Sequence, residues 1–166
     1  MTTQSLHIDR FADVKARLPG AGLPWLARLR ESGLARFTTH GVPTPKLESW
    51  HFTNISSLSK AALAPAVEAD ASRAGAASLM MPAPARVLVF VDGRFRPDIS
   101  RLGADVKGVR LMALSEVLAR DPAFAERHIG IAEDGALSGL NAAYMSDGLI
   151  LTVDAGVLLR SEEHTS

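Results

Sequence analysis

A stretch poor in large apolar side chains divides this chain in two. Residues 61–85 contain eleven alanines and three prolines. Each ordered residue there would bury little apolar area to offset the conformational entropy that ordering costs. A chain of 166 residues has room for one domain, or for a small domain and part of another. We therefore expect a helical region at 1–60, a linker at 61–85 and an α/β segment at 86–159.

Helical periodicity marks the region before the linker. In a first predicted helix, apolar residues recur at spacings of three and four, at Ile8, Phe11, Val14 and Leu18. A second helix is predicted from Leu23, with Pro24 in its first turn, where a missing N–H is not needed. Gly33 is expected to end this helix, because glycine is typical of the position after a helix C-terminus.

An aromatic stretch without a regular period follows, at residues 41–55. Two prolines, Pro43 and Pro45, favour an extended path through it. Trp50 and Phe52 then place large apolar rings in this irregular segment. The interpretation that we prefer is that the rings anchor the segment to the core. The alternative is a patch that binds a partner, because ordered aromatic loops are common at interfaces.

The region after the linker alternates strands and short helices. The Asp92-Gly93 pair predicts a tight hairpin turn after a strand at 86–91. A helix is expected from Ser115, with Val117 and Leu118 facing inward. The remaining expected elements are strands at 109–112, 149–153 and 156–159 and helices at 123–128 and 140–144.

Composition excludes several classes of chemistry. The chain has no cysteine, which rules out disulfides, thiolate metal sites and a cysteine nucleophile within it. Its 18 basic and 18 acidic residues balance, which argues against binding to nucleic acid or to an anionic membrane. No basic and apolar signal segment opens the chain, and no apolar run is long enough to span a bilayer. We expect a cytoplasmic protein.

No catalytic motif is present. The chain lacks a phosphate-binding GxxxxGK[ST] loop, a GxSxG elbow and an HExxH pair. None of the five histidines lies three or four residues from another, so no helical metal pair is predicted. A small hydrolase or transferase using His51, Asp92 or Asp147 is the enzymatic alternative, although packing and turn formation explain these residues better. We predict no catalytic, cofactor-binding or metal-binding residue, and no enzyme.

Three ordered motifs resemble the SufB/SufD family. Residues 41–53, GVPTPKLESWHFT, are similar to the family's GLPTxKxExWKYT run. The strand and turn VFVDGRF at 89–95 and the run LNAAY at 140–144, followed by Asp147-Gly148, also match. The helices and the alanine-rich linker make the chain most similar to the N-terminal part of SufD. The residues that carry over are structural, for loop anchoring and a first β-helix turn: Glu48, Trp50, Thr53, Asn141, Asp147 and Gly148.

The resemblance implies a non-catalytic scaffold subunit of the SUF machinery for iron–sulfur cluster assembly. In that family SufD pairs with SufB, and each binds one copy of the ATPase SufC in a SufBCD complex. The family fold has an N-terminal helical region, a central right-handed parallel β-helix and a C-terminal helical region. The iron–sulfur cluster is handled by the full complex, and its residues lie beyond this fragment, so no cofactor is expected here.

The end of the chain departs from the family pattern. Residues 160–166, RSEEHTS, match the translation of a common sequencing-library adapter, so we expect a non-native tail and a truncated frame. The fold expected from all these observations is α+β: a helical region, a linker and a small α/β segment that leads into a truncated β-helix. The strands at 149–153 and 156–159 would then lack stacking partners and expose an apolar edge.

Overall fold

The computed structural model describes residues 10–59, 86–130 and 135–158. The expected linker at 61–85 and the expected tail at 160–166 lie outside the described residues. Residues 10–14 are α-helical. The elements that follow are η1 (Lys15–Arg17), α2 (Pro24–His40), η2 (Glu48–Trp50), η3 (Ser56–Ser59), β1 (Phe90–Val91), β2 (Arg94–Phe95), η6 (Pro97–Ile99), β3 (Val109–Ala113), α3 (Leu114–Arg120), α4 (Pro122–His128), α5 (Ala136–Tyr144) and β4 (Leu149–Val153).

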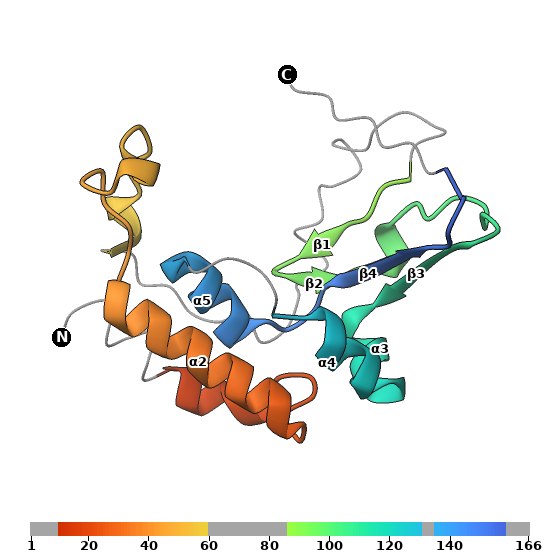
Figure 1. Ribbon diagram of the computed structural model, residues 1–166, viewed down its shortest axis with the longest axis horizontal. Helices are drawn as coiled ribbons and strands as arrows, with labels where there is room; N and C mark the ends of the chain where they lie inside the picture. Colours follow the sequence, from red (N-terminus) through yellow and green to blue (C-terminus); the bar gives the residue numbers. More distant parts are fainter. Residues whose placement is uncertain (1–9, 60–85, 131–134, 159–166) are drawn as a thin grey trace.

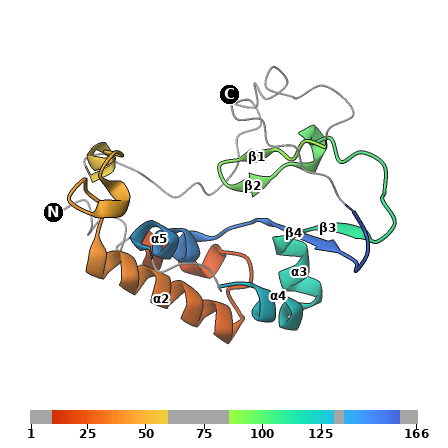
Figure 2. The same cartoon turned by 45° about the horizontal axis from the view of Figure 1, so that its top comes forward.

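The α2–α5 helix pair and the strands occupy opposite ends of the described structure. Helix α5 lies along α2 at one end, whereas the strands lie at the other end with α3 and α4 beside them (Figure 1). Both views show the same separation (Figure 2). The mixture of helices and small sheets confirms the predicted α+β class.

The contact between α2 and α5 includes two glycines, Gly33 and Gly139, that face each other. The buried positions of α5 are Ala136, Gly139 and Ala143. The buried positions of α2 recur at spacings of four, three and four, at Leu26, Arg30, Gly33 and Phe37. A Cβ added to Gly33 would lie 2.5 Å from the carbonyl oxygen of Gly139. Because neither glycine has a side chain, the two backbones pack directly against each other.

The prediction that Gly33 ends the second helix is therefore wrong. Gly33 lies in the interior of α2, where the close approach of α5 requires a residue without a side chain. The helix continues to His40 and ends at Gly41, which has a φ of 68° and donates its N–H to the carbonyl of Phe37. Gly41 is the residue after the helix, and its positive φ is one that glycine adopts readily because it has no Cβ.

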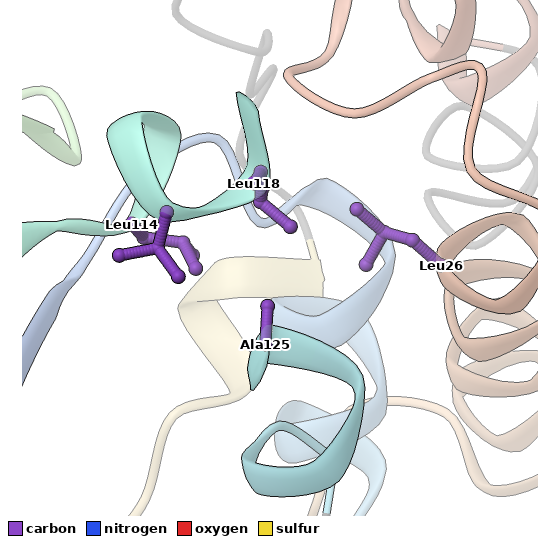
Figure 3. Packing of buried hydrophobic residues seen from close by; sticks show 5 residues of the cluster. Leu26, Leu114, Leu118 and Ala125 are labelled. Atoms are coloured by element: carbon purple, nitrogen blue, oxygen red, sulfur yellow. The ribbon is translucent and has the colours of Figure 1, made fainter. Parts of the chain in front are cut away.

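A second apolar cluster joins α2 to the α3–α4 pair. Its buried members are Leu26, Leu114, Val117, Leu118 and Ala125. Figure 3 shows the side chain of Leu26 from α2 reaching toward Leu118 of α3 and Ala125 of α4. The predicted inward orientation of Val117 and Leu118 is confirmed, since both are buried.

The described strands form two separate antiparallel pairs. Strands β1 and β2 pair as the predicted hairpin, with Asp92 and Gly93 at φ values of 49° and 76°. The first strand is shorter than expected, because Val87 makes only an isolated bridge to Arg101. Strand β4 pairs with β3 along its full length, from Val109 opposite Val153 to Ala113 opposite Leu149.

The strand expected at 156–159 does not form in its described part. Gly156 lies in a turn with a φ of 81°, and residues 157 and 158 have no regular structure. The N–H of Asp154 bonds the carbonyl of Gly108, which continues the antiparallel pairing one residue beyond Val109 and Val153. No parallel strand pair occurs among the described residues.

Candidate functional site

The side chain of Asp147 holds three elements together. Its Oδ2 atom accepts a hydrogen bond from the backbone N–H of Phe95 on β2 at 3.0 Å. Its Oδ1 atom accepts from the N–H of Gly148 at 2.9 Å and from that of Ser115 on α3 at 3.4 Å. We call this group of contacts the aspartate junction. It links the β1–β2 hairpin, the start of α3 and the connection between α5 and β4.

A carboxylate suits this position because α3 lacks a cap of its own. The residue before α3 is Ala113, whose side chain makes no capping hydrogen bond. The Asp147 carboxylate supplies the missing acceptor near the helix N-terminus, where negative charge interacts favourably with the helix dipole. Leu114 contributes a further bond, from its N–H to the carbonyl of Gly148 at 2.9 Å. The aspartate thus does more than form the turn that the sequence predicts.

A buried arginine also bonds the connection between α5 and β4. Arg30 of α2 is 2% exposed. Its Nη2 atom donates to the carbonyl of Pro19 at 2.7 Å and to that of Met145 at 3.0 Å. Burial lowers the pKa of the Arg30 guanidinium from its ordinary value. We call this the arginine clamp, and it ties the segment before α2 to the chain two residues ahead of Asp147.

Sequence reasoning missed the arginine clamp. A charged side chain on a buried helix face is rare, because a buried guanidinium needs acceptors that replace water. The available signal was the position of Arg30 at the same helical spacing as Leu26, Gly33 and Phe37. The carbonyls of Pro19 and Met145 that receive its hydrogen bonds come from distant parts of the chain, which no local pattern identifies.

The aromatic stretch forms a projecting segment, residues 41–58, which we call the aromatic segment. Successive backbone bonds shape it: Leu47 N–H to Thr44, Trp50 N–H to Leu47 and Thr53 N–H to Trp50, all at 2.9–3.0 Å. The ring of Phe52 is 97% exposed, and Leu47 is 52% exposed. Among the described residues the Phe52 ring contacts the edge of His51, with centroids 4.8 Å apart.

The interpretation that the rings anchor this segment to the core is wrong for Phe52. Local hydrogen bonds close the backbone turns without help from the core, so the ring is left outside. Trp50 is half-buried, and Pro43 is the buried residue at the base of the segment. Figures 1 and 2 show the segment beyond the end of α2, away from the strands.

The remaining motif residues are not gathered at one place. Glu48 and Thr53 are exposed on the aromatic segment, and Asn141 is exposed on α5. Asp147 and Gly148 lie in the aspartate junction at the start of β4. The structural roles expected for Glu48, Trp50, Thr53 and Asn141 remain predictions.

The residues of the enzymatic alternative also lie apart. His51 is exposed on the aromatic segment, and Asp92 is exposed in the β1–β2 turn. The Asp147 carboxylate is occupied by backbone N–H groups. Within residues 10–59, 86–130 and 135–158, no group of three or more histidine, aspartate or glutamate side chains is arranged to hold a metal ion. In the same ranges, no helix has the length and apolar character needed to cross a bilayer.

Comparison of the chain with known proteins identifies one family. The family model described as the SufBD protein N-terminal region matches residues 1–162. A curated protein of Synechocystis sp., named as an iron–sulfur cluster assembly SufBD family protein, is 26% identical over 126 residues. That match covers 74% of this chain and 28% of the relative, so the chain spans less than a third of the relative's length. No solved structure matches the chain.

Proposed function

Because the chain belongs to the SufBD family, we propose that it is the N-terminal part of a SufD-like scaffold subunit for iron–sulfur cluster assembly. The family match over residues 1–162 is the observation that carries this proposal. The curated relative supports the same process through its name. The helices before the alanine-rich linker favour a SufD-like over a SufB-like member.

The proposed subunit is non-catalytic and acts in the cytoplasm. A SufC-like ATPase would supply ATP hydrolysis, and a SufB-like paralogue would complete the scaffold on which the cluster is assembled. The geometry of Asp147 supports a structural role, because both of its carboxylate oxygens accept backbone hydrogen bonds. We further propose that the region after β4 continues into the family's parallel β-helix.

Co-purification tests the scaffold proposal. The full-length protein, carrying an affinity tag, is co-expressed with the SufB-like and SufC-like proteins of the same organism. We expect a stable ternary complex, and we expect a deletion strain to lose activity of iron–sulfur enzymes. Recovery of the full-length protein without either partner, together with unchanged iron–sulfur enzyme activity in the deletion strain, would contradict the proposal.

A second candidate function is protein binding through the aromatic segment. The observation that favours it is the 97% exposure of the Phe52 ring on a segment with a hydrogen-bonded backbone. Aromatic side chains, phenylalanine among them, are enriched in the cores of protein interfaces. Phe52→Ser in the tagged protein tests this function: loss of one partner from the complex supports it, and unchanged recovery of both partners contradicts it.

A further inference from the structure

One face of the β3–β4 sheet is entirely apolar. Residues directly opposite each other in an antiparallel pair project from the same face, and every second residue shares that face. The register places Val109 opposite Val153, Leu111 opposite Leu151 and Ala113 opposite Leu149. We call these six residues the apolar sheet face. None of them carries a polar side chain.

The two faces of this sheet have different neighbours. Met112 and Ile150 project from the other face, where they pack against the buried cluster of α3 and α4. The apolar sheet face is partly open: Leu151 is 52% exposed and Val153 is 42% exposed. Five residues after β4, Leu158 is 81% exposed. Exposed apolar side chains therefore lie on the second half of β4, at Leu151 and Val153, and again after it, at Leu158.

The size of this face favours an occupant that is covalently linked. A stable interface between separate proteins uses about 20–30 residues on each side, whereas this face has six. A segment of the same chain needs far less contact area, because its effective concentration is high when it is tethered nearby. A free partner or a second copy would gain too little contact on this face alone.

The family match indicates which part of the chain would be tethered there. The matching family model is the N-terminal region of SufBD proteins, and the match covers 28% of the Synechocystis relative. Most of the Synechocystis relative therefore lies outside the matched region. The last described strand is β4 itself, so the following segment would start beside the apolar sheet face.

We propose that the apolar sheet face is the docking surface for the segment that follows β4 in the longer polypeptide. That segment would lay apolar side chains over Leu111, Leu151 and Val153 and remove them from water. The inference rests on family membership and on the length of the Synechocystis relative. It does not rest on the proposed role in iron–sulfur cluster assembly, so either can fail alone.

The absence of cysteine makes a direct test possible. Leu151→Cys is introduced into the 166-residue chain and into the full-length product of the same gene, and the rate of maleimide labelling at residue 151 is measured by peptide mass. We expect labelling in the full-length protein to be slower by about tenfold or more, because structure that covers a site protects it.

Two further cysteine variants provide the controls, with labelling again read at the introduced residue by peptide mass. Phe52→Cys, at a site 97% exposed, is expected to label equally fast in both chains, and Leu26→Cys, at a fully buried site, should label slowly in both. Equal labelling of Leu151→Cys in both chains would overturn the proposal. Protection in the 166-residue chain that grows with its concentration would also overturn it, by identifying a second copy as the occupant. A reading frame that closes at Ser166 would leave no segment to dock and would have the same consequence.

Discussion

The carboxylate of Asp147 accepts a hydrogen bond at 3.0 Å from the backbone N–H of Phe95, 52 residues earlier in the chain. The same carboxylate bonds the N–H of Ser115 at the start of α3. One side chain thus fixes the β1–β2 hairpin and α3 relative to β4. The arginine clamp holds this connection two residues earlier, at Met145.

Replacing Asp147 should destabilise the fold. Asp147→Ala removes the acceptor for three backbone N–H groups. A hydrogen bond to a charged group contributes roughly 1.5–3 kcal/mol to the free energy of unfolding. We expect the free energy of unfolding in urea to fall by about 2 kcal/mol. Asp147→Asn keeps one acceptor oxygen and should lose less. An Asp147→Ala protein as stable as the wild type would show that the junction is not a stabilising feature.

Replacing Arg30 should also destabilise the fold. Arg30→Met keeps the length of the side chain but leaves the carbonyls of Pro19 and Met145 without their donor. We expect a loss of about 2 kcal/mol in the free energy of unfolding, because buried acceptors are left unpaired. The matched control is Arg28→Met on the exposed face of the same helix, which should change stability by less than about 0.5 kcal/mol. Equal effects of the two substitutions would contradict this account.

A methyl group at Gly33 should separate α2 from α5. Helix propensity alone favours alanine over glycine by about 1 kcal/mol, but the added Cβ would lie 2.5 Å from the Gly139 carbonyl oxygen. We expect Gly33→Ala to lower the free energy of unfolding by about 1–3 kcal/mol, the usual cost of overpacking. Gly22→Ala is the control, since its Cβ would meet nothing within 4 Å. A stabilised Gly33→Ala protein would mean that the two helices can move apart freely.

Truncation of Phe37 should lower the stability strongly, whereas truncation of Phe52 should leave it almost unchanged. Phe37 is fully buried, so Phe37→Ala is expected to cost about 3–5 kcal/mol of stability. Phe52 is 97% exposed, so Phe52→Ala should change stability by less than about 0.5 kcal/mol. Thermal and urea unfolding of both variants measure this difference. A large destabilisation by Phe52→Ala would show that its ring packs against structure in solution.

The single tyrosine provides a pH-dependent readout. Burial raises the pKa of Tyr144 from 10.0 to about 12, and its ring meets the edge of Phe11 with centroids 5.6 Å apart. In the unfolded chain the phenol loses its proton near pH 10, while the folded protein still holds it. The unfolded state then binds fewer protons, so stability should fall as the pH rises from about 10 to about 12.

Ultraviolet absorbance measures this ionisation directly, because the chain has one tyrosine. Phe11→Ala should bring the pKa of Tyr144 back toward 10, since the variant opens the ring to water. A Tyr144 that titrates near 10 in the folded wild-type protein would contradict the described packing of α5 against residues 10–14.

Local patterns in the sequence determined much of the secondary structure. Helical spacing identified the apolar positions Phe11 and Val14, which are buried, and the Asp92-Gly93 pair identified the hairpin. The family motifs at 41–53, 89–95 and 140–148 identified the family that the match over residues 1–162 confirms. Each of these signals depends on a few neighbouring residues, and short-range geometry is what a sequence encodes most directly.

The tertiary structure decided which residues hold the elements together. Gly33 is typical of a helix end in the sequence, but its lack of a side chain serves the contact with Gly139. Phe52 is apolar, yet it lies outside the core because local turns satisfy the backbone around it. Arg30 and Asp147 bond groups that lie 115 and 52 residues away. Such contacts depend on the packing of distant segments in space, and no local pattern along the chain contains that information.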